Sequence, residues 1–359
     1  MRLKFCCFPL IILCTLLVIT ACAQKDWSSG RPATAGDTPD SNYRDNKLQT
    51  VKVGDLGILS SAGNYIAKEK GYFEEEGLDV EFIKLSTSDQ IVALTTGDLD
   101  VGAGAITAAV YNANSEDIKI KIIADHGTLM KNMSNTSFVV RKDLIESGQF
   151  NGYVDLKGLR IGTPSLGNNV EIFLEKVLEK GNLTLDDVLP VVLGYPEMLT
   201  AFENGSIDAA IYNEPFITFG INSGLIERWA EGYDIYPNQQ IAAIMFSSRL
   251  AEEDKELGKK YVKAYVRGLR DYADAFQKGI NRDEIVDILV QHTSIEDRSL
   301  FDQMALSGLN PDGYLNEESL RHDAAWYVSR GLVEEEPDLN EIYDKEFLDY
   351  AMEELGRYE

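Results

Sequence analysis

The chain has little cysteine and little histidine, and both are placed where they support few kinds of chemistry. All four cysteines lie at the start of the chain, the last of them at Cys22, so residues 23–359 contain no thiol. That stretch offers no disulfide, no thiol nucleophile and no thiolate metal ligand. The three histidines (His126, His292 and His322) are scattered without a metal-ligand spacing. We therefore expect no catalytic residue, no metal site and no cofactor.

Basic residues are also in short supply. The chain has 34 Lys and Arg against 59 Asp and Glu, a formal net charge of −25. It has no basic patch, and its field has the wrong sign for nucleic acid. The glycine motifs of nucleotide-binding proteins are missing too. Gly162 and Ser165 are one residue too far apart for the Gly-x-Ser-x-Gly nucleophile elbow of hydrolases. We expect neither a nucleic-acid partner nor nucleotide hydrolysis by this chain.

One long uncharged apolar run occurs, at the start of the chain. Arg2 and Lys4 precede residues 5–20, and small residues then lead to Cys22. This pattern predicts a signal peptide over residues 1–21, since the run is too short for a confident membrane span. The cysteine resembles a bacterial lipobox, which implies lipidation of Cys22 and attachment to a membrane surface. An ordinary secretory signal with an incidental cysteine is the alternative.

Residues 22–47 are rich in small and polar residues, which predicts a flexible tether. We expect the protein to be exported and lipid-anchored at the cell membrane, on a periplasmic or extracellular face. About 310 residues follow the tether, enough for two domains.

A sequence pattern occurs twice in the part that follows. Residues 93–101 and 201–209 both fit Ala-φ-x-x-Gly-x-φ-Asp-φ, where φ is apolar. Val53-Gly54 and Ile161-Gly162 repeat at the same offset. Two matches in register predict two similar lobes, each with a strand, a glycine-containing loop, a helix and a strand. The expected fold class is therefore α/β with two lobes.

In this interpretation Gly97 and Gly205 end a helix, and a short buried strand follows each of them. The carboxyl ends of such strands open toward a crevice, where α/β sheets bind ligands. For Asp100 and Asp208 a structural role in the helix-to-strand turn is favoured over a functional one.

Two loops before helices are candidate ligand anchors, because small residues and free N–H groups at a helix start bind anions or carbonyl oxygens. The first loop carries Ser60, Ser61 and Asn64, and the second carries Thr163, Ser165 and Asn168. A plain helix cap is the alternative for the first loop. Further candidates at expected strand or helix ends are Gly104, Asp125, Tyr195, Tyr212, Asn213 and Glu214.

Several segments resemble the solute-binding proteins of ABC importers. They are residues 67–80, 93–102, 156–162, 197–202 and 207–215. The nearest subgroup contains the alkanesulfonate, taurine and nitrate binders and the thiamin-pyrimidine (THI5/NMT1-like) proteins. The resemblance implies a periplasmic-binding-protein type II fold with two crossing strands. It places lobe I at 48–136, lobe II at 137–246, and a return to lobe I with C-terminal helices at 247–359.

The resemblance also implies a mechanism, in which a monomer captures a small molecule and closes by a hinge motion. It would then dock on an ABC permease driven by a separate ATPase subunit. In such a protein Glu214→Ala and Tyr212→Ala are expected to weaken binding and barely change stability.

The residues favour a neutral, planar heteroaromatic ligand. The expected strand ends carry acids and aromatic rings with little Lys or Arg, which suits riboflavin or a thiamin-precursor pyrimidine. An alkanesulfonate, taurine or nitrate ligand is the alternative within the family. A pyrimidine-forming enzyme, and a surface adhesin or sensor, are the alternatives from other classes. The aromatic stripe from Tyr261 to Phe276 has helical spacing and is expected to be core.

Overall fold

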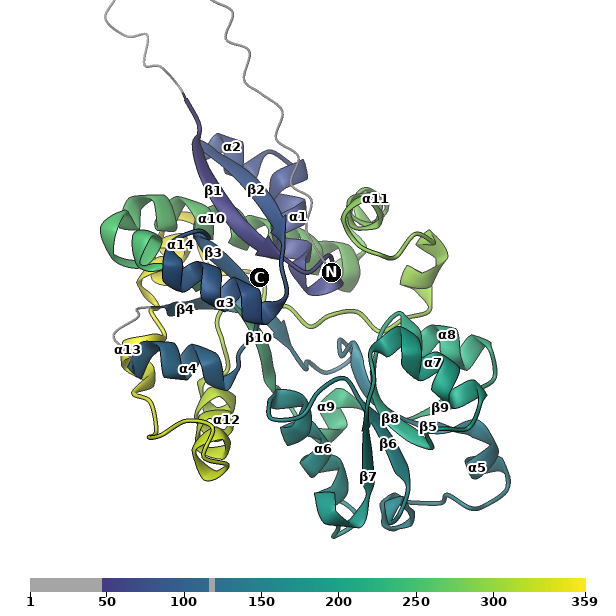
Figure 1. The fold of residues 1–359 in the computed structure, drawn as a ribbon. Coiled ribbons are helices and arrows are strands. Elements are labelled where there is room, and N and C mark those ends of the chain that lie inside the picture. The colour runs from purple at the N-terminus through teal and green to yellow at the C-terminus, as the bar shows by residue number, and fades with distance from the viewer. Residues whose placement is uncertain (1–46, 116–119) are drawn as a thin grey trace, which may run out of the picture. The chain divides into compact units, whose positions relative to one another are not determined.

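The computed structural model describes residues 47–115 and 120–359. Two five-stranded sheets form its framework (Figure 1). The first has the order β2 (Leu78–Lys84), β1 (Gln49–Asp55), β3 (Val101–Ala105), β10 (Gln240–Phe246) and β4 (Lys121–Thr128). The second has the order β7 (Leu189–Val192), β6 (Arg160–Thr163), β8 (Ala209–Asn213), β5 (Thr136–Arg141) and β9 (Ile226–Glu231).

The two sheets have the same pattern of strand directions. Strand β1 is parallel to β2 and β3, and β6 is likewise parallel to β7 and β8. In each sheet an antiparallel strand, β10 or β5, then pairs with the third parallel strand. The predicted α/β fold with two similar lobes is confirmed.

The sequence repeat coincides with this structural repeat. The first residues of β3 and β8 are as far apart in the sequence as the two copies of the sequence pattern, and so are their last residues. Helix α3 (Thr87–Thr96) ends at Gly97 with a φ of 77°, and helix α7 (Tyr195–Glu203) is followed by Gly205 with a φ of 70°. A residue with a Cβ rarely adopts this left-handed conformation, which explains why glycine occupies both turns.

The repeated aspartates fasten neighbouring strands together. Asp100 accepts a hydrogen bond from the backbone N–H of Lys52 at 2.8 Å, and Asp208 accepts one from that of Arg160 at 3.0 Å. Each aspartate thereby joins the turn before the third strand to the first strand of its sheet. These hydrogen bonds support a structural role for both aspartates in the helix-to-strand turn.

Helices surround the two sheets. The remaining ones are α1 (Ala62–Glu69), α2 (Tyr72–Glu75), α4 (Ala108–Ser115), α5 (Lys142–Glu146), α6 (Asn169–Glu179), α8 (Phe216–Asn222), α9 (Gly232–Ile235), α10 (Lys255–Ala273), α11 (Arg282–His292), α12 (Glu317–Ser329), α13 (Leu339–Ile342) and α14 (Glu346–Leu355). Helix α10 carries the aromatic stripe except for Phe276, which follows the helix. Tyr261, Tyr265 and Tyr272 are fully buried in the core of the first sheet, so the core interpretation is confirmed.

The chain passes between the sheets twice, between β4 and β5 and again between β9 and β10. The two passages are hydrogen-bonded to each other, because Leu129 N–H donates to the Gln239 carbonyl and Asn238 N–H donates to the Leu129 carbonyl, both at 3.0 Å. Strand β10, expected as the return crossing, lies within the first sheet. The division of the chain into lobes at residues 136 and 246 stays a proposal.

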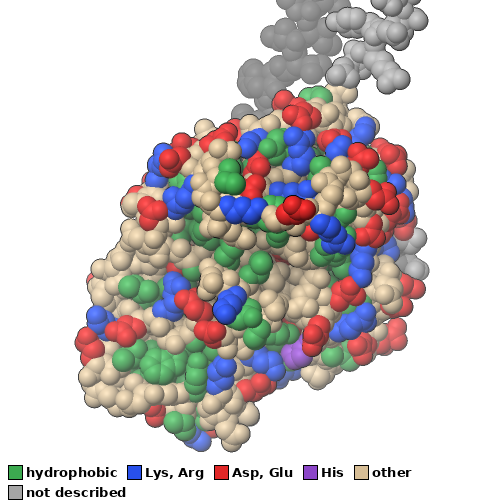
Figure 2. All heavy atoms as spheres, turned by 180° about the vertical axis from the view of Figure 1, so that it is seen from behind, with side chains coloured by type: hydrophobic (Ala, Val, Ile, Leu, Met, Phe, Trp, Pro, Cys, Tyr) green, Lys and Arg blue, Asp and Glu red, His purple; other side chains and the backbone are tan. Residues whose placement is uncertain are grey.

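The predicted signal peptide, Cys22 and residues 22–46 of the tether lie outside the described residues. Within the described part of the chain, no helix is long and apolar enough to cross a membrane. Acidic and basic side chains are interspersed over the face drawn in Figure 2. On that face the acidic excess of the sequence therefore does not form a surface of one charge sign.

Candidate functional site

The first candidate loop follows the carboxyl end of β1 and enters helix α1. The side chains of Ser60, Ser61 and Asn64 are all buried. Asn64 Oδ1 accepts a hydrogen bond from the Tyr261 hydroxyl at 2.7 Å, and Ser61 Oγ lies 3.4 Å from His126 Nε2. Ser60 Oγ has no hydrogen-bond partner among the described residues. It is therefore the hydroxyl of this loop that is most available to a ligand.

The second candidate loop follows β6 and enters helix α6, and its side chains bond mainly within the loop. Thr163 Oγ1 donates to the Ser165 carbonyl at 2.9 Å, and Asn168 Nδ2 donates to Ser165 Oγ at 2.6 Å. Asn168 Oδ1 also accepts from Val170 N–H, so Asn168 caps helix α6. These hydrogen bonds stabilise the loop from within.

Asp125 near the end of β4 is completely buried and is surrounded by donors. Its Oδ1 accepts from Gly127 N–H, Thr128 Oγ1 and Gln240 Nε2, and its Oδ2 accepts from Asn310 N–H at 2.6 Å. Burial raises the pKa of Asp125, while these hydrogen bonds favour the charged form and oppose the rise. A ligand could bind this carboxylate only by replacing a protein donor. Its role as a ligand contact stays a prediction.

His126 is buried beside the first loop. Burial lowers its pKa to about 4, although the nearby Asp55 carboxylate favours the protonated ring. Its Nδ1 lies 3.4 Å from the Tyr265 hydroxyl. The imidazole is therefore neutral near pH 7 and serves as a hydrogen-bonding group between Ser61 and Tyr265.

Tyr212 and Asn213 form the carboxyl end of β8. The Tyr212 ring is fully buried, and its hydroxyl donates to the Tyr195 carbonyl at 2.9 Å. The two tyrosine rings lie 6.0 Å apart in a small core cluster of the second sheet. Asn213 differs, because its Oδ1 is buried and has no hydrogen-bond partner among the described residues. A buried acceptor without a donor is costly, so this atom is suited to a ligand donor.

Glu214 comes next in the chain and is held by several donors. Arg228 forms an ion pair with it at 2.5 Å, and only 2% of the Glu214 side chain is exposed. Thr218 donates to Glu214 Oε2 through both its N–H and its hydroxyl, and Ala305 N–H donates to Oε1 at 3.2 Å. The Arg228 guanidinium also pairs with Glu231. Its charge is therefore already matched by protein carboxylates.

The sequence profile of a family described as NMT1/THI5-like matches residues 59–275, more than half of the chain. This chain belongs to the NMT1/THI5-like family.

Relatives of this chain with informative names are binding proteins. The riboflavin-binding protein RibY of Chloroflexus aurantiacus is 24% identical over 349 residues, which cover 93% of this chain and 95% of that protein. The formylaminopyrimidine-binding protein of Halalkalibacterium halodurans is 23% identical over 308 residues, covering 81% of this chain and 88% of that protein. The likeness to both extends well beyond the segment that the family profile matches.

Solved structures share the fold at lower identity. The ligand-binding component of an ABC-type import system from Staphylococcus aureus has a TM-score of 0.67 at 18% identity, covering 85% of this chain and 99% of that chain. The aliphatic sulphonate-binding protein SsuA of Escherichia coli has a TM-score of 0.65 at 16% identity, covering 82% and 97%. The desulfurization enzyme DszB also aligns, at 0.59 and 17% identity, covering 85% and 99%. Such identities show a common fold and nothing finer.

Within this family member, Gly104 has a packing role that the sequence did not suggest. A Cβ at that position would lie 3.0 Å from Thr87 Oγ1, so glycine lets helix α3 approach β3 closely. Its predicted contact with a ligand remains a prediction.

Two partners of the candidate acids were not predicted from the sequence. Arg228 pairs with Glu214, and the segment at 305–310 supplies one backbone N–H to Glu214 and another to Asp125. Both partners come from other parts of the chain, and no local pattern marks them. The structure thus places Ser61 beside His126, the residue that follows Asp125, in the first lobe. It places Asn213 and Glu214 at the end of β8 in the second.

Proposed function

We propose that this protein is the substrate-binding component of an ABC importer. It would capture a small solute between its two lobes and deliver it to a membrane permease that a separate ATPase subunit drives. The observation that carries the proposal is the pair of matching sheets whose strand ends present polar groups, Ser60 in one lobe and Asn213 in the other. The S. aureus and E. coli fold neighbours, named as importer and sulphonate-binding components, support it.

The proposed ligand is a planar heteroaromatic molecule, either riboflavin or a pyrimidine precursor of thiamin. Two relatives are named for ligands of these kinds. The site chemistry agrees, because Asn213 Oδ1 lacks a donor, and heteroaromatic rings of this type carry N–H groups. Asp125 and Glu214 are satisfied within the protein, so neither leaves a strong charge for an ionic ligand.

An alkanesulfonate, taurine or nitrate ligand is the alternative within the family. A sulfonate needs cationic or N–H-rich surroundings. The nearest guanidinium to the second-lobe candidates, that of Arg228, is already paired with Glu214 and Glu231. This pairing favours the neutral ligand.

An enzyme that forms the thiamin pyrimidine is the alternative from another class. The DszB neighbour is an enzyme, so the fold alone permits catalysis. The absence of cysteine beyond residue 22 and the scattered histidines speak for a binding protein.

We further propose that Cys22 carries the lipid that anchors the exported protein as a monomer at the membrane.

A fluorescence titration tests the proposal. Riboflavin would be titrated into the chain from residue 24 to 359, and the expected result is quenching that saturates at one equivalent. Asn213→Ala removes the unpartnered acceptor, and we expect roughly tenfold weaker binding from one lost hydrogen bond. Asn151→Ala, on the surface of the same lobe, is the matched control and should bind like the unmodified protein.

The other outcomes separate the alternatives. Unchanged flavin fluorescence together with heat of binding for formylaminopyrimidine would assign the pyrimidine. Binding of an alkanesulfonate, and of neither aromatic ligand, would replace the proposed ligand by the alternative. No saturable binding of any of the three would overturn the importer proposal.

A further inference from the structure

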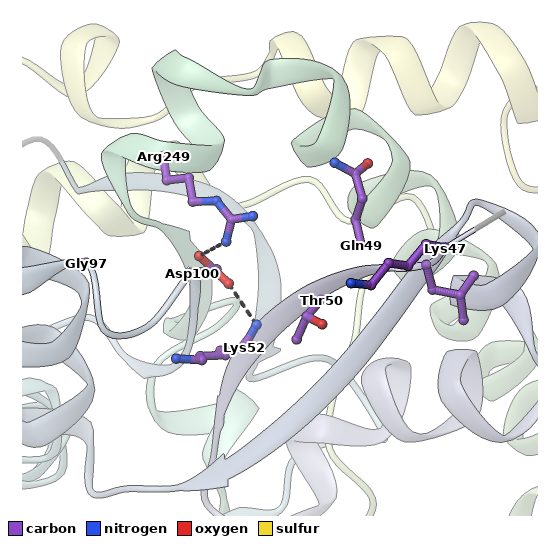
Figure 3. A pocket seen from close by; sticks show the side chains of 8 residues that line it. Lys47, Gln49, Thr50, Lys52, Gly97, Asp100 and Arg249 are labelled. Carbon is purple, nitrogen blue, oxygen red and sulfur yellow. Dashed lines mark hydrogen bonds and ion pairs between the residues drawn. The ribbon is translucent and has the colours of Figure 1, made fainter. Parts of the chain in front are cut away.

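A cavity of about 420 Å³ lies at the amino end of β1 (Figure 3), whereas the Ser60 loop follows the carboxyl end of that strand. Residues 47–50 and Lys52 of the β1 region form one side of it. The other side comes from Gly97 and Asp100, before β3, and from Arg249, after β10. The cavity is thus built by three segments of the first lobe that lie far apart in the sequence.

The charges around the cavity do not balance. Lys47, Lys52 and Arg249 are cationic, and Asp100 is the one acid among the lining residues. Asp100 accepts from Arg249 Nη1 at 2.7 Å and from the Lys52 backbone N–H, and Figure 3 shows it between these two donors. The ammonium groups of Lys47 and Lys52 have no partner among the described residues. Two lysines that line the cavity therefore have no acid partner among the described residues, in a chain whose formal charge is −25.

The second lobe shows how the corresponding place is neutralised. Arg160 occupies the position in the repeat that corresponds to Lys52, and it donates to Asp208 through Nε at 2.9 Å and through Nη2 at 2.6 Å. Arg141 adds a third side-chain hydrogen bond to Asp208 at 3.2 Å. Both cations of the second lobe are thus used on its own acid. In the first lobe only Arg249 pairs with Asp100. Lys52, at the position that corresponds to Arg160, has no side-chain partner among the described residues.

We propose that this cavity is an anion site that binds the oxygens of a phosphate group, with Lys47, Lys52 and Arg249 as the cationic donors. Ammonium groups bind phosphate oxygens as point charges, and the Arg249 guanidinium has further N–H groups beyond the one that Asp100 uses. The Thr50 hydroxyl and the Gln49 amide line the same cavity and supply neutral donors. The proposed site is separate from the solute site and does not depend on it.

Two sources could provide the phosphate. Inorganic phosphate is one, and the phosphodiester of an anionic lipid headgroup is the other. The lipid source fits the geometry because Lys47 is where the predicted lipid-anchored tether joins the described chain. The same three cations would serve either ligand.

The experiment uses residues 24–359, as in the riboflavin titration, so that neither the apolar run at residues 5–20 nor an acyl chain on Cys22 contributes to membrane binding. Inorganic phosphate would be titrated at low ionic strength and followed by calorimetry. We expect one saturable site that added salt weakens. Lys52→Gln and Lys47→Gln should each weaken phosphate binding roughly tenfold, the loss of one charge-assisted hydrogen bond. Lys131→Gln, an exposed lysine in the turn after β4, is the matched control and should leave it unchanged.

Vesicle flotation separates the two sources. Binding to phosphatidylglycerol vesicles, absent with phosphatidylcholine and weakened in Lys52→Gln, would assign the headgroup. Phosphate binding that Lys52→Gln weakens, without vesicle binding, would assign the free anion. The proposal is overturned if neither ligand binds, or if Lys52→Gln and Lys131→Gln have equal effects.

Discussion

The Glu214 carboxylate is surrounded by donors, although its position at a strand end first suggested a ligand contact. Its Arg228 partner is 20% exposed, so the ion pair is largely buried. Removing one member of a buried pair leaves the other charge poorly solvated. The sequence alone led us to expect Glu214→Ala to affect binding and not stability, and the structure changes that expectation.

We therefore predict that Glu214→Ala lowers the free energy of unfolding by about 2–3 kcal/mol, because Arg228 and Thr218 N–H lose their acceptor. Urea unfolding measures this. Glu203→Ala, an exposed acid at the end of α7, is the control and should change stability by less than about 0.5 kcal/mol. Equal stability of the two variants would contradict this prediction and would leave Glu214 as a candidate ligand contact.

His126 makes stability depend on pH. Its folded pKa of about 4 lies below the ordinary value of 6.5. As pH falls below 6.5, His126 becomes protonated in the unfolded chain but stays neutral in the folded protein until about pH 4. The contribution of the neutral ring is thus fully present above pH 6.5 and is lost between pH 6.5 and 4. The loss amounts to about 3 kcal/mol in the free energy of unfolding.

His126→Gln should remove this part of the pH dependence. The measurement is urea unfolding at several pH values from 7.5 to 4, comparing the variant with the unmodified protein. His322→Gln, at a side chain 44% exposed, is the control and should keep the slope. Equal slopes in all three proteins would show that the His126 ring is more solvated than its burial indicates.

At the scale of elements, helices α1 and α10 approach so closely that glycine is required where they meet. A Cβ on Gly268 would lie 2.1 Å from the Gly63 carbonyl oxygen, a backbone atom that cannot move aside alone. Gly268→Ala should therefore lower the free energy of unfolding by about 3 kcal/mol, an overpacking cost that outweighs the gain in helix propensity.

Thermal or urea unfolding tests this, with Gly152→Ala as the control. A Cβ on Gly152 meets no heavy atom within 4 Å, and its φ of −180° is extended backbone that any residue adopts. The control should be neutral within about 0.5 kcal/mol. A stable Gly268→Ala protein would mean that the two helices separate at little cost.

The repeat is also best understood at this scale. Asp100 and Asp208 each fasten the first strand of a sheet to the turn before the third, and the sequence pattern found both. The pattern did not reveal the different fates of Lys52 and Arg160. Arg160 pairs with Asp208, whereas the Lys52 ammonium group has no partner among the described residues. The other cations at the two aspartates, Arg249 and Arg141, come from segments far from them along the chain.

At the scale of the whole molecule, ligand binding and folding are linked. A ligand that binds only the folded protein, present at a hundred times its dissociation constant, adds about 2.7 kcal/mol to the free energy of unfolding. Riboflavin or formylaminopyrimidine should therefore raise the melting temperature, with the rise growing as the logarithm of concentration. An exposed-site variant such as Glu203→Ala should show the same rise. A melting temperature that neither ligand moves would contradict the proposed ligand class.

Much of the fold was predictable because its signals are local. Glycines that end helices, short buried strands and the aromatic stripe of α10 are periodic or conformational features of a few consecutive residues. The candidate site was predictable only in outline. Strand ends indicated which residues gather there. The sequence did not show that Asn213 Oδ1 lacks a partner, nor that Arg228 and Ala305 satisfy Glu214, because these partners lie far from it along the chain.

The sequence by itself determined the two-lobed α/β architecture, the acidic charge and the absence of thiol chemistry beyond residue 22, because these follow from composition and short-range pattern. Only the tertiary structure decided which charges are neutralised. Asp125 and Glu214 are satisfied by distant backbone N–H groups, while Lys47 and Lys52 face a cavity without an acid of their own. Electrostatic pairing acts over a few ångströms in space, and that proximity is set by how the strands and helices pack.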